Sequence, residues 1–214
     1  MNSMPRIEQA LLAALEPGES AGCPPRLAAA IRYAVFPGGA RIRPRLCLAV
    51  AQACAEDHPA IVEAAATAIE LLHCASLVHD DLPCFDDAAT RRGKPSVHKA
   101  FGERLAVLAG DAMIVLADSC RAAPARLPTL IRIIARSVGT AGGIVAGQAW
   151  ECETDAPLSQ YQQAKTGSLF AAATMAGAVS AGVSDAAPWS LLGERIGAAY
   201  QVADDILDVA GNAA

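Results

Sequence analysis

The chain has 214 residues, of which 53% are hydrophobic, and this length suits one domain with a large core. Its net charge of −5, without a basic block, argues against nucleic acid or an anionic membrane surface as the main partner. The seven cysteines form no CxxC pair, which fits neither a disulfide framework nor a zinc site and indicates a cytoplasmic protein.

Helices are predicted along the whole chain. Aromatic residues make up only 4% of it, runs of β-branched residues are scarce, and apolar residues recur at spacings of three and four. The connections contain Pro or Gly, and no Asn-Gly or Asp-Gly pair indicates a hairpin. In chain order, helices are expected over residues 7–15, 26–35, 46–53, 61–82, 103–121, 127–149, 158–181 and 188–209. The predicted fold class is therefore all-α.

Neither the N-terminus nor the uncharged stretch 167–183 is predicted to enter a membrane. The N-terminal helix carries Glu8 within its apolar pattern and lacks a hydrophobic run behind a basic start, so it does not match a signal peptide. Residues 167–183 are rich in Ala, Gly and Ser, which favours a close-packed buried helix. No membrane span is expected.

A first acidic cluster, Asp80, Asp81, Asp86 and Asp87, stands where the helix over residues 61–82 ends. Carboxylates this close repel one another unless something compensates their charge. Mg2+ prefers a few carboxylates and fills its other sites with water and phosphate oxygens, so the cluster suits a metal diphosphate. The alternative is a solvated acidic helix end.

A second acidic cluster lies near the C-terminus. Asp204 and Asp208 are four residues apart, and Gln201 is one turn earlier on the same helix face. Their apolar neighbours, such as Val202 and Ile206, predict a buried helix, where carboxylates need paired charges or a metal. Two such helix faces suggest that both line one cavity and share metal ions around a diphosphate.

Cationic residues that suit phosphate oxygens accompany these clusters. They are Arg41 and Arg43, the run of Arg91, Arg92 and Lys94, and Lys165. Singly, each is more often a surface residue. His73 lies two helical turns before Asp80 on the same face, where it is either a core residue or points into the same cavity.

Together these residues resemble the trans-prenyltransferase family, which includes the farnesyl and geranylgeranyl diphosphate synthases. Residues 71–98 (LLHCASLVHDDLPCFDDAATRRGKPSVH) resemble its first aspartate-rich motif, and residues 200–208 (YQVADDILD) resemble its second. PGGARIRP, GDAM, GQ and KTGSLF, at residues 37–44, 110–113, 147–148 and 165–170, match further family landmarks. The resemblance implies an isoprenoid-synthase-like helical bundle around a central cavity, a homodimer, and a single domain over residues 1–214 that lacks the family's C-terminal helices.

The resemblance also implies a role for each matching residue. The implied Mg2+ ligands are Asp80, Asp81, Asp86, Asp204 and Asp208. The implied contacts of the allylic diphosphate are Arg91, Lys165, Thr166 and Gln201. The implied contacts of isopentenyl diphosphate are Arg43, His73 and Arg92, with Arg41 as the expected substitute for a family lysine that is Ala40 here. Asp80, Asp81, Lys165, Thr166 and Gln201 are the expected catalytic residues.

The implied reaction is the Mg2+-assisted condensation of isopentenyl diphosphate with dimethylallyl, geranyl or farnesyl diphosphate. Ala75 and Ser76, about one turn before Asp80, are the expected floor of the chain-length cavity, and their small size favours geranylgeranyl diphosphate as product. The alternatives are a farnesyl diphosphate synthase, a non-catalytic partner subunit of a heteromeric synthase, a class I terpene cyclase, and a helical bundle with acidic patches. The second DDxxD, which ends at Asp208, argues against the cyclase.

Overall fold

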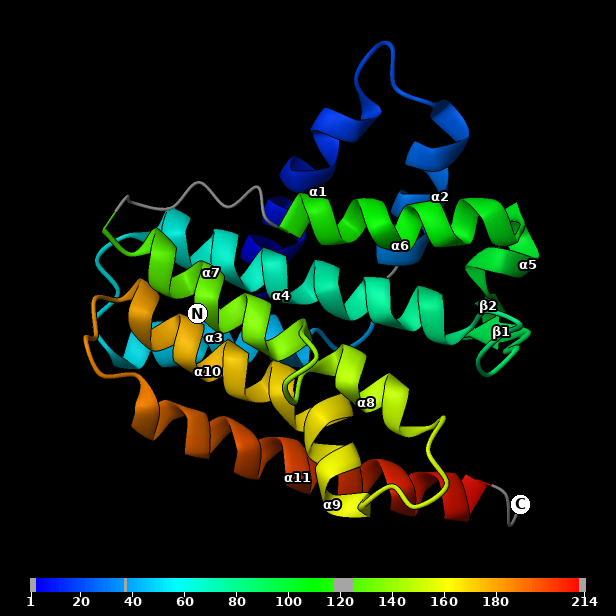
Figure 1. The fold of residues 1–214 in the computed structure, drawn as a ribbon. Coiled ribbons are helices and arrows are strands. Elements are labelled where there is room, and N and C mark those ends of the chain that lie inside the picture. Colours follow the sequence, from blue (N-terminus) through cyan, green and yellow to red (C-terminus); the bar gives the residue numbers. More distant parts are fainter. Residues whose placement is uncertain (1–2, 37, 118–124, 212–214) are drawn as a thin grey trace. The chain divides into compact units, whose positions relative to one another are not determined.

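The computed structural model describes residues 3–36, 38–117 and 125–211, with side chains described through Leu207. Helices dominate it, and the predicted all-α class is confirmed (Figure 1). The first six helices are α1 (Met4–Glu19), α2 (Pro25–Val35), α3 (Ile42–Ala53), α4 (Pro59–Asp80), α5 (Val97–Phe101) and α6 (Glu103–Ala117). The later ones are α7 (Leu127–Val138), α8 (Ile144–Trp150), α9 (Leu158–Gln162), the π-helix η1 (Gln163–Gly167), α10 (Ser168–Ser180) and α11 (Ala187–Gly211).

The chain forms two compact units. The first comprises Met1–Arg45 and Ala66–Arg121, and the second comprises Leu46–Ala65 and Ala122–Ala214. Helix α4 therefore gives its N-terminal part to the second unit and its C-terminal part to the first. The single domain over residues 1–214 stays a prediction.

In the first unit, α1 packs against α2, and α2 packs against α5 and α6 (Figure 1). Ile7, Leu11 and Leu15 recur every four residues on α1 and are buried, as an amphipathic helix requires. The carbonyl groups at the end of α2 lack helical partners, and the Lys94 ammonium group donates to two of them, on Tyr33 and Phe36. Lys94 thereby ties the segment after α4 to α2.

A small hairpin, which the sequence did not predict, follows the first acidic cluster. Strands β1 (Thr90–Arg91) and β2 (Lys94–Pro95) pair antiparallel. The turn residues Arg92 and Gly93 have φ angles of 54° and 75°. Positive φ at both central residues is the geometry of a type I′ turn, which Asn-Gly normally signals. The Arg-Gly pair gave no such signal, so the expectation of no hairpin was wrong.

In the second unit, α10 is buried along most of its length, which confirms the predicted buried helix. It packs against both α7 and α11. Glycines on α11 allow the backbones to approach closely: a Cβ at Gly193 would lie 2.4 Å from the carbonyl oxygen of Phe170, and one at Gly197 would lie 3.0 Å from Cα of Gly167. These two glycines set the spacing of α11 from α10.

Three predicted helices differ from the structure. The helix expected over residues 127–149 is two helices, α7 and α8, because the chain turns through residues 139–143, with a φ of 98° at Gly142. The one expected over 158–181 changes from α9 to the π-helix η1 and then to α10. The one expected over 103–121 is helical to Ala117, and the rest of it lies outside the described residues.

Among the described residues, one helix, α4, is long and apolar enough to cross a membrane by length and composition alone. In its most apolar stretch, 72% of the residues are buried inside the protein, as in a core helix.

Candidate functional site

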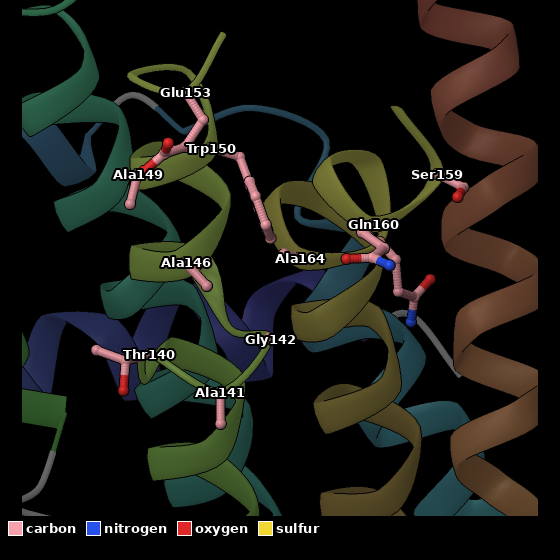
Figure 2. A pocket seen from close by; sticks show the side chains of 11 residues that line it. Thr140, Ala141, Gly142, Ala146, Ala149, Trp150, Glu153, Ser159, Gln160 and Ala164 are labelled. Carbon is pink, nitrogen blue, oxygen red and sulfur yellow. The ribbon is translucent and has the colours of Figure 1, made fainter. Parts of the chain in front are cut away.

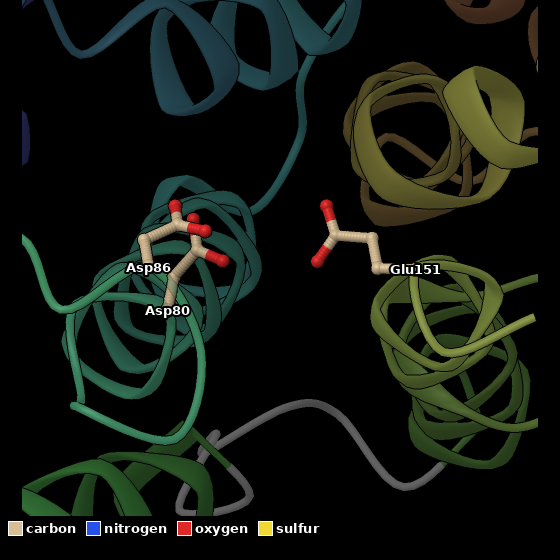
Figure 3. Close-up of side chains that lie close together, drawn as sticks. All are labelled: Asp80, Asp86 and Glu151. Atoms are coloured by element: carbon tan, nitrogen blue, oxygen red, sulfur yellow. The ribbon is translucent and has the colours of Figure 1, made fainter.

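The end of α4 brings two of the predicted metal ligands together. After Asp80 the chain folds back, and the backbone N–H of Asp86 donates to the carbonyl oxygen of Asp80 at 3.0 Å. The two side chains consequently lie next to each other, with carboxylate oxygens within 4.8 Å (Figure 3). Asp80 is buried and Asp86 is exposed. Adjacent carboxylates with oxygen donors only are what a hard cation such as Mg2+ requires, so these residues fit it.

Asp81 and Arg91, predicted to hold metal and diphosphate, contact each other. The guanidinium group of Arg91 donates from Nε to Oδ1 of the buried Asp81 at 2.9 Å and again from Nη2. Burial by itself lowers the pKa of Arg91, but the hydrogen bond and the charge of Asp81 outweigh it and raise that pKa. Asp81 therefore orients the Arg91 guanidinium and partly offsets its positive charge.

A second pair of predicted site residues, Arg43 and His73, joins α3 to α4. Nη1 of Arg43 lies 3.3 Å from Nε2 of His73. Burial, followed by the charges of Arg43 and Arg92, holds the pKa of His73 well below its usual value. His73 is thus neutral, and because a guanidinium can only donate, Nε2 accepts and the imidazole proton is on Nδ1. Arg92 lies beside Gly39, where a Cβ would be 3.1 Å from its Nε.

The environment of Arg41 does not fit the substrate contact that we predicted for it. Its side chain is fully buried and donates to Glu8, to Glu70 and to the carbonyl oxygen of Val35. Burial lowers the pKa of Arg41, but these carboxylates outweigh it and raise that pKa above the ordinary value. Its donors are turned toward the protein, so Arg41 is not positioned to contact a substrate.

In the second unit, η1 positions Lys165 and Thr166. A π-helix is rare and often occurs at functional sites, since its extra residue per turn shifts the side chains that follow. The segment lies close against α8: a Cβ at Gly147 would be 2.6 Å from the Lys165 backbone. Thr166 Oγ1 donates to Oε1 of Gln201 at 2.7 Å, so these two predicted residues meet.

Glu151 is a candidate site residue that the sequence did not reveal. Its Oε1 accepts from Nζ of Lys165 at 2.6 Å and from the hydroxyl of Tyr161 at 2.7 Å. It follows the GQ landmark by three residues, and that spacing on α8 was the available signal. Glu151 and a bound diphosphate would compete for the Lys165 ammonium group.

The second acidic cluster is more exposed than expected. Asp204 and Asp205 are exposed on α11, and Nε2 of Gln201 donates to Oδ1 of Asp205 at 2.8 Å. Val202 and Ile206 are 58% and 61% exposed, so the prediction of a buried helix here was wrong for the described residues. The reason is that α11 continues past its contact with η1 at Gln201. The backbone of Asp208 belongs to α11, and its side chain lies outside the described part.

The two predicted chain-length residues lie on different faces of α4. At roughly 100° per residue, Ser76 is about 40° from Asp80 around the helix, whereas Ala75 is about 140° away. Ser76 is half-buried and donates to the carbonyl oxygen of His73, while Ala75 is 2% exposed. Ser76 therefore shares the face of Asp80, and Ala75 does not.

A cavity of about 620 Å³ lies in the second unit, between α8 on one side and α9 with η1 on the other (Figure 2). Trp150 and Glu153 line one side, and Gln160 and Gln163 line the other. None of the predicted site residues whose side chains are described lines this cavity, so the cavity is separate from the contacts that those side chains make.

Comparison with known proteins gives a consistent result. Residues 24–214 match the family model for polyprenyl synthetase. The geranylgeranyl diphosphate synthase of Rhodobacter capsulatus is 57% identical over 95% of this chain and 72% of its own length, and that of Cereibacter sphaeroides is 55% identical over the same shares. An FPP/GFPP synthase structure from Zymomonas mobilis matches with a TM-score of 0.83 and 35% identity, covering 96% of this chain and 81% of that one. The predicted family is thereby confirmed, and the chain belongs to the polyprenyl synthetase family of trans-prenyltransferases.

Proposed function

We propose that the protein is a prenyl diphosphate synthase that condenses isopentenyl diphosphate with an allylic diphosphate, with geranylgeranyl diphosphate as product. The observation that carries the proposal is one array in the first unit: the adjacent carboxylates of Asp80 and Asp86, Arg91 held by Asp81, and a further cationic group from Arg43. Metal ligands and diphosphate-binding cations side by side suit a substrate that is a metal-bound polyanion. The names of the relatives above support the product.

The residues that would hold Mg2+ are Asp80, Asp81, Asp86, Asp204 and Asp208. Bound Mg2+ would neutralise charge on the leaving diphosphate. Arg91, Lys165, Thr166 and Gln201 bind and orient the allylic diphosphate. Because Asp81 already fixes Arg91, and Gln201 already fixes Thr166, little ordering is left to occur on binding.

Arg43, His73 and Arg92 bind isopentenyl diphosphate. A neutral His73 accepts from Arg43, which fixes the guanidinium, and its Nδ1–H is the donor available to a ligand. The allylic carbon–oxygen bond breaks first, the double bond of isopentenyl diphosphate attacks the cation, and a proton leaves to the released diphosphate. The protein positions both substrates and excludes water from the cation.

A homodimer in the cytoplasm is part of the proposal. Helix α6 exposes apolar side chains that a second copy would cover, namely Val107, Leu108, Ile114 and Val115. Val107 and Leu108 lie seven residues, or two helical turns, before Ile114 and Val115, so the four side chains form one stripe. Sedimentation velocity is expected to show a dimer for the wild type and a weakened dimer for Val115→Asp. A monomeric wild type contradicts the proposed homodimer.

The proposal is tested by incubating the purified protein with Mg2+, labelled isopentenyl diphosphate, and dimethylallyl, geranyl or farnesyl diphosphate in turn. The expected product is geranylgeranyl diphosphate, sized by chromatography after dephosphorylation. A product that stops at farnesyl diphosphate identifies the alternative chain length. No condensation with any allylic substrate overturns the proposal and favours a non-catalytic subunit.

A further inference from the structure

Arg41 and Glu70 form a buried ion pair that has no part in the reaction above. Nη1 of Arg41 donates to Oε1 of Glu70 at 2.7 Å, and the two side chains are 0% and 2% exposed. Withdrawing two charges from water is costly unless each is fully paired. Here Glu8 accepts from Nε and Nη2, and the carbonyl oxygen of Val35 accepts from Nη2, so the guanidinium links α1, α4 and the end of α2.

The backbone around Arg41 is strained, and its side chain occupies space that only glycine leaves open. Arg41 has a φ of 52°, in the left-handed region that residues other than glycine seldom adopt. A Cβ on Gly38 would lie 2.0 Å from Cζ of Arg41. The strained backbone persists because the buried ion pair and the missing Cβ together determine it.

The Arg41–Glu70 ion pair lies directly beside Arg43, a proposed substrate contact. Arg43 follows Arg41 by two residues and stands in the first turn of α3, and His73 follows Glu70 by three residues on α4. Residues three apart on a helix are neighbours on one face. The contacts of Arg41 with Glu70 and of Arg43 with His73 are therefore two adjacent links between the start of α3 and α4.

We propose that the Arg41–Glu70 pair is a positioning device for Arg43, which sets the affinity for the diphosphate of isopentenyl diphosphate without touching it. This inference rests on the proposed function, which assigns Arg43 to that substrate. The pair fixes the backbone at which α3 begins, and the position of that backbone determines where the Arg43 guanidinium lies. A displacement of about 1 Å in such a group lowers its contribution substantially.

The main test variant is Arg41→Leu/Glu70→Leu, which replaces the ion pair by apolar side chains that a core accepts. The expected result is a KM for isopentenyl diphosphate raised about tenfold, equal to a loss of about 1.4 kcal/mol of binding. The KM for geranyl diphosphate and kcat at saturation stay within about twofold, because Arg43 contributes to neither. Arg41→Lys keeps the positive charge but loses the planar guanidinium that donates to several acceptors at once. A smaller rise of the KM for isopentenyl diphosphate is therefore expected.

The matched control is Arg32→Leu/Glu19→Leu. This pair also joins two segments of the first unit, with a 2.7 Å contact, but it is exposed and is not adjacent to Arg43. The KM values of the control are expected to equal those of the wild type. Circular dichroism of each variant confirms a folded chain, and if the double Leu variant does not fold, Arg41→Lys decides the question by the same KM comparison.

The outcomes separate this inference from the proposed function. A selective rise in the KM for isopentenyl diphosphate supports the positioning role. A wild-type KM in a folded Arg41→Leu/Glu70→Leu variant, or an equal rise for both substrates, overturns it while the proposed function stands. A wild type that neither condenses nor, by calorimetry, binds isopentenyl diphosphate overturns both.

Discussion

The hydroxyl of Thr166 donates a 2.7 Å hydrogen bond to the side-chain oxygen of Gln201, 35 residues further along the chain. The contact joins the π-helix η1 to α11, and it exists because Gly197, one turn before Gln201, lets α11 approach Gly167. Two residues that we assign to the allylic diphosphate are therefore oriented by each other.

Thr166→Val is expected to lower the free energy of unfolding by about 1 kcal/mol, since it removes one hydrogen bond and keeps the side-chain shape. It also removes one of the two hydrogen bonds that orient the Gln201 side chain, so the KM for the allylic substrate rises. Gln201→Leu has a similar effect, and the double variant loses less than the sum of the two. Urea unfolding of the wild type, the two single variants and the double variant measures the coupling free energy between Thr166 and Gln201. If the losses in free energy of unfolding are strictly additive, the contact is contradicted.

Gly147→Ala is expected to destabilise the protein by about 1 to 3 kcal/mol, because the new Cβ meets the Lys165 backbone. The displaced η1 moves Lys165, so the KM for the allylic diphosphate rises as well. Gly18→Ala is the control, since a Cβ there meets nothing within 4 Å. That change, inside α1, is expected to stabilise by about 0.5 to 1 kcal/mol. Thermal unfolding distinguishes them, and an unchanged melting temperature of Gly147→Ala contradicts the close approach.

Stability is expected to fall as the pH drops below about 6.5, the pKa of an unfolded histidine. The folded pKa of His73 is well below that value, so in this window the unfolded state binds more protons than the folded state. The slope attributable to His73 is at most ~1.4 kcal/mol per pH unit. His73→Gln is expected to flatten the dependence. A wild-type slope in His73→Gln contradicts the assignment.

Ser76→Phe is expected to shift the main product from geranylgeranyl to farnesyl diphosphate, because Ser76 lies below Asp80 on the same face of α4. Ala75→Phe places a ring on a buried face, so it is expected to destabilise the protein by about 1 to 3 kcal/mol in addition to any change in product. Chromatography of the products, together with the melting temperatures, separates the two positions. If neither variant shortens the product, α4 does not set the chain length.

The sequence predicted most of the helices and the clustering of Asp80 with Asp86, because periodicity and local spacing determine both. It did not predict the β1–β2 hairpin, since Arg92 and Gly93 adopt a turn that their residue types seldom signal. It assigned Arg41, like its neighbour Arg43, to isopentenyl diphosphate, because Arg41 was the expected substitute for a family lysine that is Ala40 here. Their difference depends on Glu8 and Glu70, which lie 33 and 29 residues away and show no pattern that links them to Arg41.

The contact of Glu151 with Lys165 and the exposure of the helix around Asp204 also could not be predicted from the sequence. Glu151 meets Lys165 only because Gly147 lets α8 approach η1, and a glycine in a helix does not reveal what approaches it. Near Asp204, apolar residues predicted burial, but burial depends on what packs against a helix face.

The most direct test of the central claim compares turnover of the wild type with that of Asp80→Ala at saturating Mg2+ and both substrates. The account predicts that the wild type incorporates labelled isopentenyl diphosphate and that Asp80→Ala loses at least about 100-fold in kcat while its circular dichroism spectrum stays helical, because a carboxylate needed for leaving-group neutralisation is gone. Asp155→Ala, at an exposed aspartate outside the proposed site, retains wild-type turnover. Near-normal turnover in a folded Asp80→Ala variant would contradict the account.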